Sequence, residues 1–398
     1  MFLSRFLMVL ICLISSQTLA SVLVNSDPIG TDIELKQVSP TEWLVTYNFP
    51  QKISSLDFGR NLLGYRENAW HSISPNSHYQ RLNQGDSYLV ENALSLWTFQ
   101  VNLFQFYPNN SYLPISTFSD GGVVFDLGQL VAQVKTALGW QSMRPHFILG
   151  ALQDQQALFL TDDSDEIPSY VYFGTKPVLQ KGHLKLLIDS KLPSWLLGIF
   201  SDVIFEKLID FYQKKLSPLP AKSTTLIVAW AVPPKHHFES KILGGEINNQ
   251  LIFTLYGQGF EVESVFTRQT LLKTLAHEVA HLWQPQASVD VEQPEFHEGG
   301  AEWLAVNTLL ATDLWTRSQY TEFNKNMQYQ CHKQTSDKQQ GVASPDYFNA
   351  YACAYDYFRS LPVDGFKLWE ALLSASKRSQ SPIDQFLIEK TLKQVGTM

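Results

Sequence analysis

The sequence predicts an α+β fold, in which a β-rich N-terminal half precedes a mainly helical C-terminal half with a small sheet. Before about residue 190, short runs of alternating apolar and polar residues are separated by Gly, Pro and Asn. After Pro193 the apolar residues recur at helical spacing. The length of 398 residues also suits two domains better than one. We therefore expect a β-rich domain at 21–190 and a second domain at 191–398.

The first twenty residues have the pattern of a secretory signal peptide. Arg5 gives a positively charged start, Phe6 to Ser15 form an apolar stretch, and Thr18-Leu19-Ala20 supplies small residues for cleavage. The apolar stretch is about ten residues long, whereas crossing a bilayer requires roughly twenty. We expect cleavage after Ala20, a mature chain without a membrane span, and a periplasmic or secreted protein.

Alternating apolar and polar residues predict strands in the N-terminal half. Residues Trp43 to Phe49 alternate, and we expect Pro50 to close this strand. A second alternating run extends from Trp97 to Leu103. A continuous apolar run follows at Val123-Val124-Phe125. These patterns favour a β-sandwich-like domain, with one possible helix from Leu130 to Leu138.

The residue patterns of the C-terminal half predict helices around a small sheet. Trp195 to Leu216 has apolar residues at helical spacing. Strands are expected at Thr225 to Ala231 and at Leu251 to Tyr256, and helical patterns dominate from Thr267 to the end.

The composition excludes some classes of protein. With 44% hydrophobic and 17% charged residues, the chain is globular rather than disordered. The formal charge of -8, without a cluster of Lys and Arg, disfavours nucleic acid as a partner. Outside the leader, only Cys331 and Cys353 remain. In an oxidising compartment they could form a disulfide, and the alternative is two separate buried thiols.

The motif His277-Glu278-Val279-Ala280-His281 predicts a zinc site. Residues four apart on a helix project from one face, so His277 and His281 can hold one Zn²⁺ from the same side. Glu278 is about 100° further round the helix, where its carboxylate can reach a metal-bound water without being a ligand. We therefore expect Glu278 to act as a general base.

A catalytic zinc needs a third protein ligand and one open position. The segment 294–305 offers Glu298 and Glu302, which are four apart and share a helix face. The intervening Gly299 and Gly300 weaken a helix by about 1 kcal/mol each, a cost accepted where another backbone or an ion must come close. The spacing alone leaves both glutamates as candidates.

At these residues the chain resembles the gluzincin metallopeptidases, specifically the aminopeptidase N and glycyl aminopeptidase families. In those families a Glu directly before a Gly supplies the third ligand, which implies Glu298, with His297 as a neighbour. The resemblance also implies a thermolysin-like peptidase domain at 191–398, in which Glu302 orients a zinc-binding histidine without contacting the metal. Sixteen residues separate His281 from Glu298, slightly fewer than in those families.

The resemblance extends to two further segments. Gly244, Gly245 and Glu246 correspond to a strand that pairs with the substrate, although Glu246 is displaced from the position of the family's acid. The alternative for this stretch is a plain turn before a core strand. Tyr351 corresponds to a tyrosine that stabilises the oxyanion, with Tyr347 and Tyr355 as alternatives. The other interpretation of these tyrosines is an aromatic core helix.

Together these features predict an exported zinc-dependent peptidase that hydrolyses a peptide or protein substrate with a zinc-activated water. The ligands would be His277, His281 and Glu298. Two alternatives remain: a non-catalytic zinc-binding or scaffold protein on a peptidase fold, and a zinc hydrolase of another amide or ester.

Overall fold

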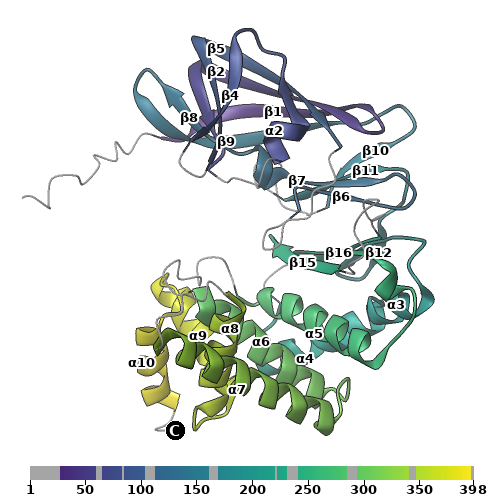
Figure 1. Cartoon of the computed structure of the whole chain (residues 1–398), viewed down its shortest axis with the longest axis vertical. Coiled ribbons are helices and arrows are strands. Elements are labelled where there is room, and N and C mark those ends of the chain that lie inside the picture. The colour runs from purple at the N-terminus through teal and green to yellow at the C-terminus, as the bar shows by residue number, and fades with distance from the viewer. Residues whose placement is uncertain are drawn as a thin grey trace, which may run out of the picture.

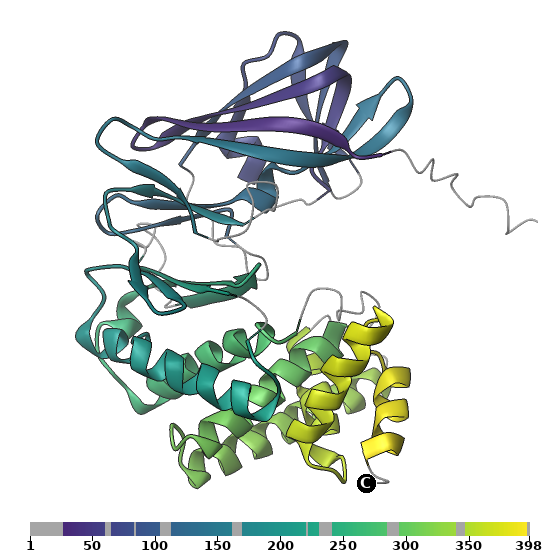
Figure 2. The same ribbon diagram turned by 180° about the vertical axis from the view of Figure 1, so that it is seen from behind.

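The computed structural model describes residues 27–59, 65–82, 85–103, 113–160, 169–219, 222–230, 241–284, 294–339 and 347–395. The expected signal peptide, 1–20, lies outside these residues. Strands fill the first part of the chain and helices the last, which confirms the α+β class. Figures 1 and 2 show three sheets stacked in succession above a group of helices.

The first sheet has the order β1-β9-β8-β2-β5-β3, and β4 also pairs with β5. Strands β1, β2, β5 and β9 are long, and buried residues alternate with exposed ones along β1, β8 and β9. The short helix α2 (Tyr65–Ala69) lies beside it. The strand bounds are β1 (Ile29–Ser39), β2 (Glu42–Asp57), β3 (Trp70–Ser72), β4 (Ser77–Leu82), β5 (Gly85–Asn102), β8 (Gln133–Thr136) and β9 (Gly139–Gly150).

The second sheet has four strands in the order β10-β11-β7-β6 and shares a hydrophobic core with the first. At the centre of this core, the rings of Trp43 and Phe125 pack edge to face with centroids 4.8 Å apart. The bounds are β6 (Ile115–Thr117), β7 (Val123–Asp126), β10 (Gln156–Phe159) and β11 (Tyr170–Gly174).

Two sequence-based expectations in this half were wrong. Leu130 to Leu138 is not a helix: a 3-10 turn at Leu127–Leu130 leads into β8, where buried Val134 and Thr136 alternate with exposed residues at a period of two. Strand β2 also continues beyond Pro50 to Asp57. Its pairing with β5 shifts register between Asn48 and Ile53, an irregularity that accommodates a residue without an N–H.

The third sheet has the order β12-β13-β14-β16-β15, with β13, β14 and β16 parallel and an antiparallel strand at each edge. One face packs against the second sheet through a small core that includes Tyr172 and Ile252. The side chain of Gln250 also accepts from Tyr170 N at 2.6 Å and donates to Tyr170 O at 3.0 Å. The bounds are β12 (Leu179–Lys181), β13 (Leu184–Ile188), β14 (Thr224–Trp230), β15 (Lys241–Ile247) and β16 (Gln250–Tyr256).

The helices cover the other face of the third sheet and form the largest core of the protein. The stretch expected as one helix from Trp195 to Leu216 is two, because Ser201 caps α4 by accepting from Ile204 N. A 3-10 turn, η2 (Gln258–Phe260), precedes α5. The bounds are α3 (Ser194–Ile199), α4 (Asp202–Lys215), α5 (Val265–His281), α6 (Pro294–Ala311), α7 (Arg317–Gln339), α8 (Tyr347–Ser360), α9 (Gly365–Ser379) and α10 (Gln385–Val395).

Cys331 and Cys353 form a disulfide that joins α7 to α8. They are therefore not two separate buried thiols, the alternative that the sequence left open. Within the described ranges, no helix is both long enough and apolar enough to cross a membrane.

Candidate metal centre

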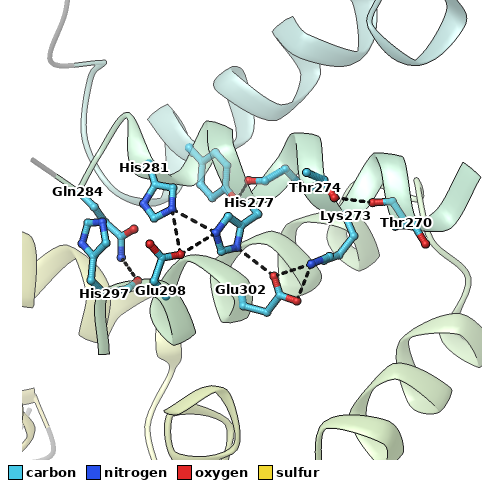
Figure 3. A network of polar contacts seen from close by, with 11 residues as sticks. Thr270, Lys273, Thr274, His277, His281, Gln284, His297, Glu298 and Glu302 are labelled. Atoms are coloured by element: carbon cyan, nitrogen blue, oxygen red, sulfur yellow. Dashed lines mark hydrogen bonds and ion pairs between the residues drawn. The ribbon is translucent and has the colours of Figure 1, made fainter. Parts of the chain in front are cut away.

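The candidate centre lies between α5 and α6. Leu271, Leu275 and Val279 of α5 are fully buried in the helical core. His277 and His281 lie on another face of α5, one turn apart, and meet side chains of α6 (Figure 3). The helix carrying the motif is therefore fixed by its own apolar residues, which leaves the polar face free to meet α6.

Three donor atoms converge at this place. His277 Nε2 lies 3.1 Å from Glu298 Oε2 and 3.1 Å from His281 Nε2. His281 Nε2 lies 3.6 Å from Glu298 Oε2. One donor atom from each of His277, His281 and Glu298 could therefore bind the same metal ion. Ligands at the corners of a tetrahedral zinc site, about 2.1 Å from the ion, lie about 3.4 Å apart, so the three atoms have the spacing that such an ion requires.

Glu302 lies on the other side of His277. Its Oε2 is 2.9 Å from His277 Nδ1, and Lys273 Nζ lies 2.9 Å from Oε1 and 3.1 Å from Oε2 of the same carboxylate. The structure therefore separates the two glutamates: Glu298 meets both Nε2 atoms, whereas Glu302 meets the Nδ1 of one histidine. Lys273 was not found from the sequence, although its position four residues before His277 places it on the same helix face.

His297 is a neighbour of this cluster. Its ring stacks on that of His281, with centroids 4.7 Å apart and planes at 19°. Gln284 Nε2 donates to the backbone carbonyl of His297 at 3.2 Å. Neither His297 nor Gln284 belongs to the group of converging donor atoms.

Glu278 faces strand β15. A Cβ built on Gly244 would lie 3.1 Å from Glu278 Oε1, so strand and carboxylate are in close contact. Gly244 and Gly245 lie inside β15 and pair with Phe253 and Ile252 of β16, so they do not form a turn. The turn is made by Asn248 and Asn249, which follow the end of β15 and both have positive φ.

Glu246 is on the same face of β15 as Gly244, because alternate residues of a strand share a face. Its Oε1 accepts from Asn249 N at 2.6 Å. Burial raises the pKa of Glu246, and nearby Glu278 raises it as well, while Asn249 N–H and His281 lower it.

The charges of the centre are strongly coupled. Burial lowers the pKa of His277, but hydrogen bonds to Glu298 and Glu302 outweigh it and raise that pKa to about 10. For Glu302, burial raises the pKa, and Lys273 with His277 brings it down to about 2. The pKa of Glu298 is also lowered, because the two histidines outweigh its burial. Burial raises the pKa of Glu278, against the opposing effect of the histidines, which suits a proton acceptor.

The paired glycines of α6 allow other helices to come close to the centre. A Cβ on Gly299 would lie 2.4 Å from the Cβ of Ala354 in α8. A Cβ on Gly300 would lie 2.0 Å from the ring of Trp369 in α9. The glycine beside Glu298 thus sets the distance between α6 and α8.

The three candidate tyrosines are on α8. Tyr355 is fully buried and its hydroxyl donates to Asn324, so it has a packing role. Tyr351 is half-buried, and it lies three residues before Ala354, on the face that meets α6. The side chain of Tyr347 lies outside the described residues.

Comparison with known proteins supports the fold. The sequence matched no protein-family model and no curated protein. An aminopeptidase N family protein from Idiomarina loihiensis is similar in structure over 93% of this chain and 70% of its own, with a TM-score of 0.56 and 13% identity. An M1 zinc metallopeptidase from Deinococcus radiodurans aligns over 92% of this chain and 90% of its own, with a TM-score of 0.43 and 13% identity. The yeast LTA4 hydrolase aligns over 92% of this chain and 64% of its own, with a TM-score of 0.44 and 11% identity. The similarity to the protein from Idiomarina loihiensis, which has the TM-score above 0.5 among these three, supports an aminopeptidase N-like fold for this chain.

Proposed function

We propose that this chain is a zinc-dependent peptidase that hydrolyses peptide bonds. The observation that carries the proposal is the triangle formed by two imidazole Nε2 atoms and one carboxylate oxygen, with sides of 3.1, 3.1 and 3.6 Å. Two histidines and one carboxylate are a donor set of catalytic zinc sites, and they suit Zn²⁺ better than the oxygen-loving ions. The aminopeptidase N-like fold supports the same conclusion.

His277, His281 and Glu298 would hold the metal, and Glu302 would orient His277 through Nδ1. When bound, Zn²⁺ supplies a Lewis acid that polarises a substrate carbonyl and makes water more acidic. Glu278 takes a proton from the attacking water and delivers it to the leaving amine. The contact of its carboxylate with Gly244 of β15, the strand proposed to bind substrate, supports this role.

Strand β15 would bind the substrate. It is an edge strand of the third sheet, and an extended peptide can add to such an edge by backbone pairing. Gly244 allows the close approach to α5, and Glu246 contributes a partly buried acid on the same face of the strand as Gly244. Tyr351 would donate a hydrogen bond to the oxyanion that develops on the substrate.

We also propose that the protein is exported to the periplasm or the outside of the cell. The pattern of residues 1–20 supports this, and so does the disulfide between Cys331 and Cys353, because such bonds persist in oxidising compartments. In this proposal the mature chain consists of the β-rich domain at 21–190 and the thermolysin-like peptidase domain at 191–398. The partner is a peptide or protein substrate.

The test is a screen of the mature protein against a peptide library, with and without a chelator. Chelator-sensitive cleavage is expected, and the cleavage positions separate exopeptidase from endopeptidase action. Glu278→Gln should abolish cleavage and keep zinc near one ion per chain, whereas His277→Ala should lose the metal. A wild-type protein that binds zinc but cleaves no peptide, ester or amide would instead be the non-catalytic alternative.

A further inference from the structure

Lys273 is the charged residue of α5 closest in sequence to the metal motif, and its contacts go to the candidate centre (Figure 3). We infer that Lys273 is a positioning residue. It holds the carboxylate of Glu302 in the orientation in which that carboxylate accepts a hydrogen bond from Nδ1–H of His277. The inference rests on the proposed zinc site and goes beyond it, because it assigns a role to a residue outside the metal ligands and their direct partners.

The carboxylate of Glu302 bridges Lys273 and His277. Lys273 Nζ contacts both oxygens of Glu302, at 2.9 and 3.1 Å. Glu302 Oε2 then lies 2.9 Å from His277 Nδ1. With both oxygens held from the Lys273 side, rotation of the carboxylate away from His277 would break a charge-assisted hydrogen bond.

Because Glu302 is buried, its carboxylate needs the contact with Lys273. The side chain of Glu302 is 9% exposed and that of Lys273 is 23% exposed. A buried carboxylate requires a partner charge and hydrogen bonds for each oxygen. His277 meets Oε2, whereas Lys273 also meets Oε1. Without Lys273, Glu302 would be expected to rotate towards water or to take up a proton.

The orientation of Glu302 decides the state of His277. A metal requires the neutral ring of His277. Because an ionised carboxylate can only accept a hydrogen bond, the one ring proton that remains in this neutral form must be on Nδ1. The lone pair of Nε2 then points towards Glu298 and His281, where the metal would be held. Partners of this kind fix the tautomer of metal-binding histidines, and their loss weakens metal binding.

The ammonium also balances the charge of the centre. The carboxylates of Glu278, Glu298 and Glu302 lie around the same histidines, and Lys273 contacts the last of them. With a divalent ion bound and the three acids ionised, these charges sum to zero only when Lys273 is counted.

The experiment measures the Kd of zinc by competition with a chromophoric chelator. The mature protein is compared with Lys273→Met, which removes the charge, and Lys273→Arg, which keeps it. We expect about tenfold weaker binding in Lys273→Met, and recovery of most of the affinity in Lys273→Arg. The matched control is Arg268→Met, which removes another cation of α5 that pairs with exposed Glu263 at 2.9 Å. Its Kd should stay within about twofold of wild type.

A double-mutant cycle tests whether Lys273 acts through Glu302. If it does, Lys273→Met should cost nothing further in the Glu302→Gln background. An undiminished effect in that background, or a wild-type Kd for Lys273→Met, would overturn the inference and leave the zinc site intact. Wild-type protein that binds no zinc would overturn the proposed function as well. Circular dichroism checks folding, and if Lys273→Met does not fold, Lys273→Gln is judged by the same criterion.

Discussion

Gly244 in β15 and Glu278 in α5 pack so closely that even a Cβ on Gly244 would be in tighter contact with the carboxylate than is usual. A Cβ on Gly244 would lie 3.1 Å from Glu278 Oε1, 3.3 Å from its Cγ and 3.2 Å from Phe253 Cε1. Gly244 has no positive φ that would require glycine, so the reason for glycine here is space. The strand proposed to bind substrate and the carboxylate proposed to move the proton are therefore positioned by one another.

Gly244→Ala should accordingly lower the turnover number without removing the metal. The added methyl displaces the carboxylate of Glu278 by a few tenths of an ångström. We expect about tenfold in rate, which corresponds to about 1.4 kcal/mol. Steady-state kinetics and zinc content measure the two effects separately. Gly198→Ala is the control, because a Cβ at that position in α3 meets nothing within 4 Å. An unchanged turnover number in Gly244→Ala would show that Glu278 is not the base or that it adjusts freely.

Gly300→Ala should destabilise the helical part of the protein. Its Cβ would lie 2.0 Å from Cζ2 of Trp369, a ring with no exposed surface. Such overpacking of a core costs about 1 to 3 kcal/mol, although alanine is the better helix former. Urea unfolding of the metal-free protein checks this, with Gly198→Ala as the matched helical control. A variant at least as stable as wild type would mean that α6 and α9 can separate without cost.

The parts of the site that depend on local spacing were predictable from the sequence. His277 and His281 meet because residues four apart share a helix face, whatever the rest of the chain does. The second helix was also predictable, since Glu298 and Glu302 have the same spacing. Which of the two meets the Nε2 atoms depends on how α5 and α6 pack, and spacing within one helix does not contain that information.

Long-range packing also explains what the sequence did not reveal. Lys273 is an ordinary helix residue until α6 brings Glu302 within 2.9 Å of it. For Gly244 and Gly245 the sequence left open a strand and a plain turn, and their pairing with β16 makes them part of a strand. The stretch from Leu130 to Leu138 failed as a helix because pairing with β2 and β9 favours the alternating pattern of β8.

Zinc binding should release about one proton at pH 8. The carboxylates of Glu298 and Glu302 outweigh burial and raise the pKa of His277 to about 10, so the metal-free protein carries a proton on His277 well above pH 7. A metal needs the neutral ring, so the proton must leave and the affinity should increase as the pH rises towards 10. Titration calorimetry in two buffers of different ionisation enthalpy measures the release. Glu302→Gln should reduce it, and release near zero from wild type would contradict the coupling of His277 to the two glutamates.

The disulfide between Cys331 and Cys353 should stabilise the fold without contributing to the metal site. It closes a loop with a sequence separation of 22 residues, which corresponds to about 3 kcal/mol from the restricted unfolded chain. The variant with both cysteines changed to serine should lose that much free energy of unfolding in urea, and reduced wild type is the control that should match it. Zinc content should stay at one ion per chain in the folded variant, because the proposed ligands are on α5 and α6 while the disulfide joins α7 to α8. Loss of zinc from a folded, disulfide-free protein would instead show that α8, through the contact of Ala354 with Gly299, holds Glu298 in place.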